Sequence, residues 1–124
     1  MAVSCAEFFV LPDFYATREK DPEWDLNLTF TAEVSHEIFN AAEGVASCEW
    51  TWSVHSKVGR KTALSIKATY IVIYSNLHEC EQEAVTAYMR RVGRFATYPY
   101  FRAHVSQISW ESATNLPILP TIST

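Results

Sequence analysis

Few residues in this 124-residue chain have the types and the spacing of a reactive site. The nearest candidate is His78-Glu79-Cys80-Glu81, in which four side chains of metal-binding type follow one another. A tetrahedral metal site takes its ligands from more than one such cluster, and the sequence offers no second one. A polar loop that opens a helix explains these four residues better, so we predict no metal site.

Nucleophilic and phosphate-binding patterns are also missing from the sequence. Cys5 and Cys48 lack a recognisable catalytic context, and His36, His55 and His104 are widely separated. A lone cysteine is usually a small buried apolar residue, and a histidine without a partner is usually structural. With three glycines in the chain, a phosphate-cradling loop is excluded. We therefore expect a protein that is not an enzyme and that uses no cofactor.

Arginines alternate with aromatic residues in the second half of the chain, a combination that can bind single-stranded nucleic acid. The residues are Arg90, Arg91, Arg94 and Arg102 with Tyr88, Phe95, Tyr98 and Tyr100. The alternative is the solvent-facing side of a helix beside its buried stripe, and we favour it. No region is basic enough to neutralise a phosphate backbone, so no nucleic-acid partner is expected.

The composition indicates one domain over residues 1–124 with an excess of large apolar side chains. Aromatic residues make up 14 % of the chain and hydrophobic residues 48 %, and a domain of this size has little interior volume. The excess predicts an oligomer interface or a groove for apolar partners, the alternative being a tryptophan-rich monomer core. Three scattered cysteines, with no leader peptide and no apolar run long enough to span a membrane, indicate a cytoplasmic protein.

Alternating polar and apolar residues predict four strands before any helix. The clearest runs are 26–35, 49–57 and 62–75, and a weaker segment, 8–15, is interrupted by Pro12. The run 62–75 becomes apolar on both faces at Ile71 and Ile73, which is typical of a central, doubly covered strand. Strands joined by short turns form an antiparallel sheet.

The period changes to that of a helix after Glu79. The first apolar stripe consists of Ala84, Val85, Tyr88, Val92 and Phe95. We expect Gly93 to weaken this helix and a second helix to begin near Tyr98-Pro99, with Phe101, Val105 and Ile108 as its stripe. The expected fold is α+β, a four-stranded antiparallel sheet with two C-terminal helices packed on one face.

This order of elements, together with two local sequences, resembles the SecB family of protein-export chaperones. The local sequences are Tyr98-Pro99-Tyr100-Phe101-Arg102 and the apolar tail Leu116-Pro117-Ile118-Leu119-Pro120, and the resemblance covers about residues 26–122. It implies a homotetramer, built as a dimer of dimers, whose hydrophobic grooves hold unfolded preproteins for the translocase motor. The chain is shorter than typical members and stops at Thr124, without the segment through which they engage the motor. Because some SecB-like relatives serve toxin–antitoxin systems, the motor and an antitoxin are alternative partners.

The resemblance implies an ATP-independent holdase that binds unfolded polypeptides; the alternative is an assembly protein that binds one specific partner. The client-binding residues that we predict are Trp50, Trp52, Leu64, Tyr70, Tyr98, Phe101, Leu116 and Ile118. Core and groove need the same residue types, so the pattern does not separate them. The tail cannot continue a helix, because each Pro lacks an N–H group. We expect it to lie along the body of the protein, the alternative being a free terminus.

Overall fold

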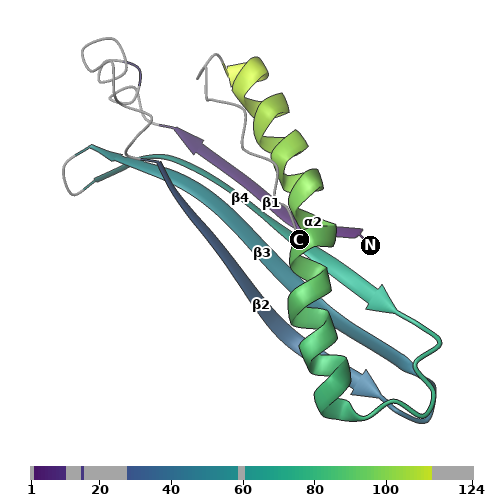
Figure 1. Cartoon of the computed structure of the whole chain (residues 1–124). Helices are drawn as coiled ribbons and strands as arrows, with labels where there is room; N and C mark the ends of the chain where they lie inside the picture. The colour runs from purple at the N-terminus through teal and green to yellow at the C-terminus, as the bar shows by residue number, and fades with distance from the viewer. Residues whose placement is uncertain (1, 11–14, 16–27, 59–60, 113–124) are drawn as a thin grey trace.

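The computed structural model describes residues 2–10, 15, 28–58 and 61–112. The element order is β1 (Ala2–Val10), β2 (Leu28–Asn40), β3 (Val45–Val58), β4 (Lys61–Tyr74) and α2 (Gln82–Ser112). Figure 1 shows the long helix lying across one face of a sheet of long strands. The apolar tail and the strand residues that were expected at 11–14 and 26–27 lie outside the described residues.

The four strands form one antiparallel sheet in the order β1-β4-β3-β2. The strands β2, β3 and β4 pair in sequence order. The first strand, β1, pairs with β4 on the edge that β3 leaves free. The expected four-stranded antiparallel sheet is therefore confirmed. Two strands, β1 and β2, form the edges, and β4 is central, as expected. Its doubly apolar end is not covered on both faces by the described residues, because Ile73 is 62 % exposed.

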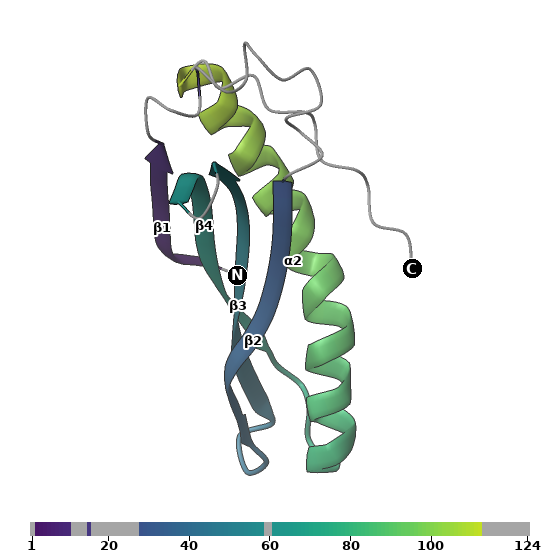
Figure 2. The same cartoon turned by 90° about the vertical axis from the view of Figure 1, so that its left-hand side faces the viewer.

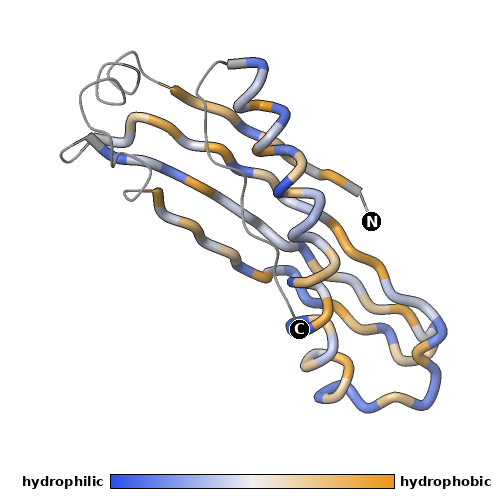
Figure 3. The backbone as a smooth tube through the Cα atoms, turned by 45° about the horizontal axis from the view of Figure 1, so that its top comes forward, coloured by the Kyte–Doolittle hydropathy of each residue, from blue (hydrophilic) through white to orange (hydrophobic). Residues whose placement is uncertain are grey.

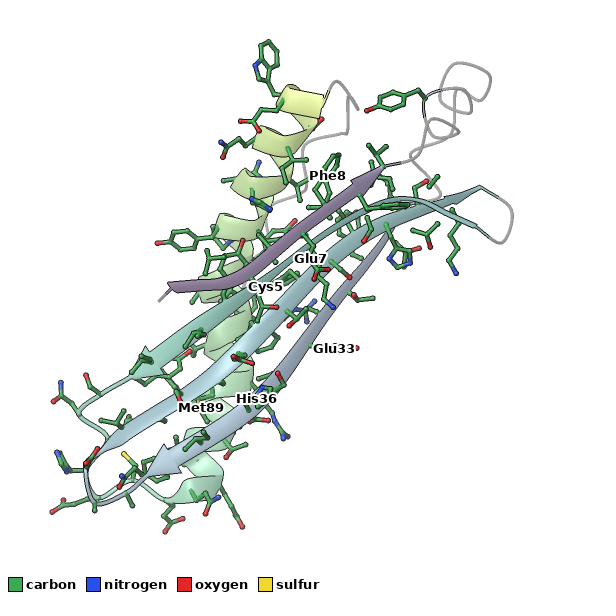
Figure 4. All side chains as sticks on the ribbon, turned by 180° about the vertical axis from the view of Figure 1, so that it is seen from behind. Cys5, Glu7, Phe8, Glu33, His36 and Met89 are labelled. Atoms are coloured by element: carbon green, nitrogen blue, oxygen red, sulfur yellow. The ribbon has the colours of Figure 1, made fainter. Side chains whose placement is uncertain are left out.

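Figure 3 shows hydrophobic and hydrophilic residues alternating along the strands. Because successive side chains of a strand point to opposite faces, the sheet has one apolar and one mainly polar face. On β3, Trp50, Trp52 and Val54 are buried under the helix, while Thr51 and Ser53 on the opposite face are half-buried. We call the second face the open face. Figure 4 views it from the side away from the helix, with Glu7, Glu33 and His36 along it.

A bulge interrupts β2 between Ser35 and Ile38, where one extra residue enters the strand. His36 has a φ of 51°, in the left-handed region. The extra residue reverses the alternation, so that Phe39 lies on the helix side and Ile38 on the open face. This reversal explains why the alternation read from the sequence stopped at Ser35, although the strand continues to Asn40.

The expectation of two C-terminal helices is wrong, because α2 runs without a break through Gly93 and Pro99. Figure 2 shows this helix following the sheet along its length. Apart from Tyr98, its buried residues recur every four positions: Val85, Met89, Gly93, Thr97, Phe101, Val105 and Ser109. Such a row is one of the natural ridges of a helix surface. Packing over seven successive ridge positions holds the helix together where the local sequence alone favours a break. The helix is not apolar enough over its length to cross a membrane.

Candidate functional site

All six of the predicted client-binding residues that the structure describes lie in the core. All six are at most 5 % exposed, and Leu64 and Phe101 have no exposed surface at all. The six are Trp50, Trp52, Leu64, Tyr70, Tyr98 and Phe101. Leu116 and Ile118 lie outside the described residues. The structure thus brings six of the eight together between sheet and helix, where they stabilise the fold; their contact with a client stays a prediction.

Aromatic rings make up much of the contact between β3 and α2. The ring of Trp52 lies 5.0 Å from that of Tyr98 and 6.0 Å from that of Phe101, measured between centroids. Trp50 stacks beside it at 6.5 Å. Offset ring pairs at these separations add to the stabilisation that comes from burial alone. The Tyr98-Pro99-Tyr100-Phe101 sequence therefore places two rings of the helix against Trp52 of the sheet, which in turn stacks on Trp50.

A buried hydrogen-bond chain fixes the helix over these tryptophans. Trp52 Nε1 donates to Thr97 Oγ1 at 2.7 Å, and the Thr97 hydroxyl donates to the Gly93 carbonyl oxygen at 2.8 Å. Gly93 faces Trp50 so closely that a Cβ atom there would lie 2.2 Å from Trp50 Nε1. Gly93 is thus a close-packing position inside the helix, not its end.

An ion pair ties the same helix to the bulge of β2. Arg90 donates three hydrogen bonds of 3.1–3.2 Å to the Glu37 carboxylate. Glu37 is mostly buried, whereas the Arg90 side chain is exposed. On the open face, His36 Nδ1 lies 2.6 Å from Glu49 Oε2. The bulge therefore directs the side chains of His36 and Glu37 to opposite faces of the sheet, where they meet Glu49 and Arg90.

Burial shifts the pKa of several core groups toward their neutral forms. Desolvation raises the pKa of Tyr70 and of Tyr74 to about 12 and also raises the pKa of the Cys48 thiol. It lowers the pKa of His104, whose buried Nε2 has no hydrogen-bond partner in the described part of the chain. Each shift disfavours charge, so at neutral pH the Cys48 thiol and the two phenols keep their protons and the His104 imidazole is neutral.

The His78–Glu81 segment joins β4 to α2. Its histidine ring packs against Gly44 of the β2–β3 turn, and Leu77 N donates to the Gly44 carbonyl oxygen at 2.9 Å. Among residues 2–10, 28–58 and 61–112, no three His, Cys, Asp or Glu side chains come close enough to hold a metal ion. The segment therefore packs the β4–α2 connection against the β2–β3 turn.

The apolar surface that a partner can reach consists of other residues. Within the part of the chain that the structure describes, the exposed large hydrophobic side chains are Val3, Phe8, Phe9, Phe30, Ile38, Ile73, Tyr88, Tyr100 and Trp110. Sequence reasoning missed all nine as binding residues, because no periodic signal separates an uncovered apolar face from a covered one. Only the doubly apolar end of β4 pointed to one of them, Ile73.

The first half of α2 carries a second apolar stripe beside the buried row. A groove of about 420 Å³ on this side is lined by Ala87, Tyr88, Arg91, Val92 and Phe95. Three of these residues belong to the stripe expected from the sequence. The expected stripe was therefore divided, with Val85 in the core and Tyr88, Val92 and Phe95 on a partly uncovered face.

A second hollow lies where β4 ends and α2 begins, and we call it the edge pocket. It has a volume of about 480 Å³. Its lining residues are Ile73, Tyr74, Ser75, Leu77, Cys80, Ala84, Val85 and Tyr88. The rings of Tyr74 and Tyr88 meet edge to face at 5.4 Å and form one wall.

Comparison with known proteins identifies the fold. No protein-family model matches the sequence, and no curated protein matches it significantly. Among solved structures, the chain is similar to the SecB-like chaperone of Mycobacterium tuberculosis, solved in complex with a ChAD peptide from an antitoxin. The TM-score is 0.72 at 19 % sequence identity, over 98 % of this chain and 86 % of that chain. The protein described here therefore has the α+β fold of SecB-like chaperones.

Proposed function

We propose that this protein is an ATP-independent chaperone, a holdase that binds unfolded polypeptides in the cytoplasm without catalysis. The observation that carries the proposal is the set of nine exposed large apolar side chains on a chain whose core is already filled. Exposed apolar side chains that gather along one groove, as Tyr88, Val92 and Phe95 do on α2, are typical of a surface that binds partners. The SecB-like fold supports the same conclusion.

Binding of an unfolded chain needs apolar contacts that tolerate many sequences, together with backbone groups that can pair. The exposed rings provide the first requirement. The outer edges of β1 and β2 provide the second, since an edge strand presents unpaired N–H and C=O groups to an extended peptide. No reacting group takes part in such binding, and no cofactor is required.

We further propose a homotetramer, a dimer of dimers, formed through residues 81–94 at the start of the helix and an edge of the sheet. The second stripe of the helix supports this assembly, because Tyr88, Val92 and Phe95 line a groove that no described residue fills. A mass near the 14.1 kDa of one chain in light scattering at micromolar concentration would overturn this proposal. Tyr88→Glu should weaken the assembly by charging the stripe, whereas Gln107→Glu, on the other half of the helix, should not.

The biological partner is either the export machinery or a toxin–antitoxin system. A similar structure holds an antitoxin-derived peptide, and this observation favours a specific client as the second candidate function. In that case the chain would be an assembly protein that keeps the SecB-like fold and binds one partner. We propose protein export through the translocase motor as the general role and antitoxin protection as the specialised one.

The test is suppression of aggregation of several unrelated unfolded proteins, without ATP and at a near-stoichiometric ratio. A holdase protects most of them. Trp110→Ser should weaken protection, because this indole is 88 % exposed and contributes apolar contact area; Gln107→Ser, on the same helix turn, is the matched control. Protection of none of the proteins would refute the holdase proposal, and protection of a single one would favour the specific partner.

A further inference from the structure

The side of α2 that faces away from the sheet carries a second row of residues spaced four apart. We call this row the outer ridge; it consists of Glu83, Ala87, Arg91 and Phe95. Ala87 lies midway between the buried residues Val85 and Met89, about 200° around the helix from each. Figure 2 shows the described sheet on one side of this helix only. A second helix can therefore reach the outer ridge without meeting the sheet that α2 covers.

Two opposite charges on the outer ridge have no partner within the described part of the chain. Glu83 and Arg91 are both exposed, and neither belongs to one of the described ion pairs. They are eight residues apart, about 12 Å along the helix axis. Charged side chains of one helix pair when they are three or four residues apart, so these two cannot pair with each other. The outer ridge thus offers one carboxylate and one guanidinium to a partner.

The smallest side chain of the outer ridge lies halfway between these charges. Glu83 precedes Ala87 by four residues, and Arg91 follows it by four. A small residue lets a second helix approach closely where the ridges of two helices cross. A two-fold axis at Ala87 places Glu83 of each chain beside Arg91 of the other, because such an interface uses the same patch on both subunits. The outer ridge is therefore complementary to a second copy of itself in charge and in spacing.

Hollows on both sides of Ala87 fit the same arrangement. The hollow toward the start of α2 has a volume of about 730 Å³. Its lining residues are Glu81, Gln82, Glu83, Thr86, Ala87 and Arg90. Arg90 is already bound to Glu37, so the carboxylates of this hollow are free for another cation. The groove of about 420 Å³ described above lies on the other side of Ala87 and includes Arg91. The two-fold axis sets the acidic hollow of one chain against the Arg91 side of the other.

From this geometry we infer that a second copy of the chain docks on the outer ridge, with the two α2 helices antiparallel and crossing at Ala87. Reciprocal pairs between Glu83 of one chain and Arg91 of the other fix the register. The inference rests on the proposed assembly and deepens it, because it assigns the crossing point, the direction and the charges. These charges select a sister subunit over a helix that lacks the same pattern.

The first test is sedimentation velocity of the full-length protein at micromolar concentration, with the charges reversed one at a time. Glu83→Arg or Arg91→Glu alone sets like charges against each other twice in a symmetric pair. Each variant should weaken the assembly about tenfold or more. The matched control Arg94→Glu makes the same change at another exposed arginine of the helix and should leave the mass unchanged. An equal effect of Arg91→Glu and Arg94→Glu would overturn the register.

Restoring the opposite charges separates pairing from damage to the fold. The double variant Glu83→Arg/Arg91→Glu exchanges the two charges and should assemble as the wild type does. An equimolar mixture of the two single variants should also assemble, with both chains in every complex, because each contact then joins opposite charges. Failure of both restorations would overturn the inference.

The crossing point is tested by size instead of charge. Ala87→Phe places a ring where the two helices are closest and should halve the mass of the assembly. Ala103→Phe adds the same ring at another exposed alanine of α2 and should leave the mass unchanged. Circular dichroism of both variants checks that the helix is intact; if Ala87→Phe does not fold, the charge exchange decides. Equal masses of two folded variants would overturn the crossing at Ala87.

Failure of this inference differs from failure of the proposed function. If the wild type assembles but ignores all of these charges, the tetramer proposal stands and the register is wrong. If the single charge variants keep the wild-type mass but protect fewer unfolded proteins, a client occupies the outer ridge and the inference is wrong. A wild-type mass near that of one chain would overturn the assembly together with its register, and suppression of aggregation would still decide the holdase function.

Discussion

Gly93→Ala tests whether the close packing of α2 on the sheet at Gly93 contributes to the stability of the fold. A Cβ atom at position 93 would lie 2.2 Å from Trp50 Nε1, whereas an ordinary contact begins near 3.4 Å. The indole must therefore move by about 1.2 Å. It has little room to do so, because Trp50 is 5 % exposed and stacks against Trp52.

Two opposing effects determine the magnitude. Replacing a mid-helix glycine by alanine stabilises a helix by about 1 kcal/mol. Overpacking a filled core destabilises it by about 1–3 kcal/mol. Since the contact is with the rigid ring of a buried side chain, overpacking should prevail. We expect a net loss of about 1 kcal/mol in the free energy of unfolding, or a fall of roughly 4 °C in Tm for a chain of this size.

The assay is urea unfolding at fixed protein concentration, in two backgrounds. In wild type, Gly93→Ala should be destabilising. In a Trp50→Leu background the indole is gone, and the same change should become stabilising by up to about 1 kcal/mol through helix propensity alone. Ala96→Gly, at an exposed position of the same helix, calibrates that propensity. A stabilising effect of Gly93→Ala in wild type, or the same effect in both backgrounds, would refute the reasoning.

Three further predictions concern the contacts that hold the helix on the sheet. Thr97→Val removes the acceptor of a buried indole N–H and should lower the free energy of unfolding by about 1–3 kcal/mol; in a Trp52→Phe background the loss should shrink, and an unchanged loss would contradict the assigned hydrogen bond. The lowered pKa of His104 means that the unfolded chain takes up a proton before the folded one as pH falls below about 6.5. Stability should therefore decline from pH 7 to pH 5, and Tm should decline less in His104→Gln. Arg90→Met leaves the Glu37 carboxylate without its partner and should lower the free energy of unfolding by about 1 kcal/mol, with a smaller difference in 1 M NaCl than at low salt.

Much of the sheet could be predicted from local pattern, because alternation follows directly from the geometry of a strand. The segments around Trp50–Val54 and Leu64–Val72 were located correctly for this reason. The continuation of β2 past Ser35 could not be read in the same way. The bulge adds one residue there, so the apolar positions change parity at Ile38 and Phe39.

The single helix shows the limit of local propensity. Gly93 and Pro99 each disfavour a helix in isolation, yet both lie inside α2. What overrides them is tertiary: an indole occupies the space that a side chain at position 93 would need, and rings on either side of Pro99 pack against Trp52. Neither contact is visible before the strands and the helix are brought together.

The binding residues were harder to predict than the fold. The six aromatic and aliphatic residues chosen from the sequence are the ones that the fold itself needs most. The exposed residues Tyr88, Tyr100 and Trp110 are of the same types, and only the position of the sheet separates them from the core. Exposure is a property of the assembled structure. The composition therefore predicted more large rings than one core can bury, but it did not show which rings stay exposed.

Because the buried positions along α2 repeat every four residues, the uncovered sides of its two halves point in different directions. An α-helix advances about 100° per residue, so each step of four residues rotates the contact line by about 40°. Over the six steps from Val85 to Ser109 the line turns by about 240° around the helix axis. The uncovered side of the first half, with Tyr88 and Phe95, therefore points in a different direction from that of the second half, with Tyr100 and Trp110. In the proposed assembly, the first half of this one continuous helix would contact a sister subunit while its other end stays open to a client.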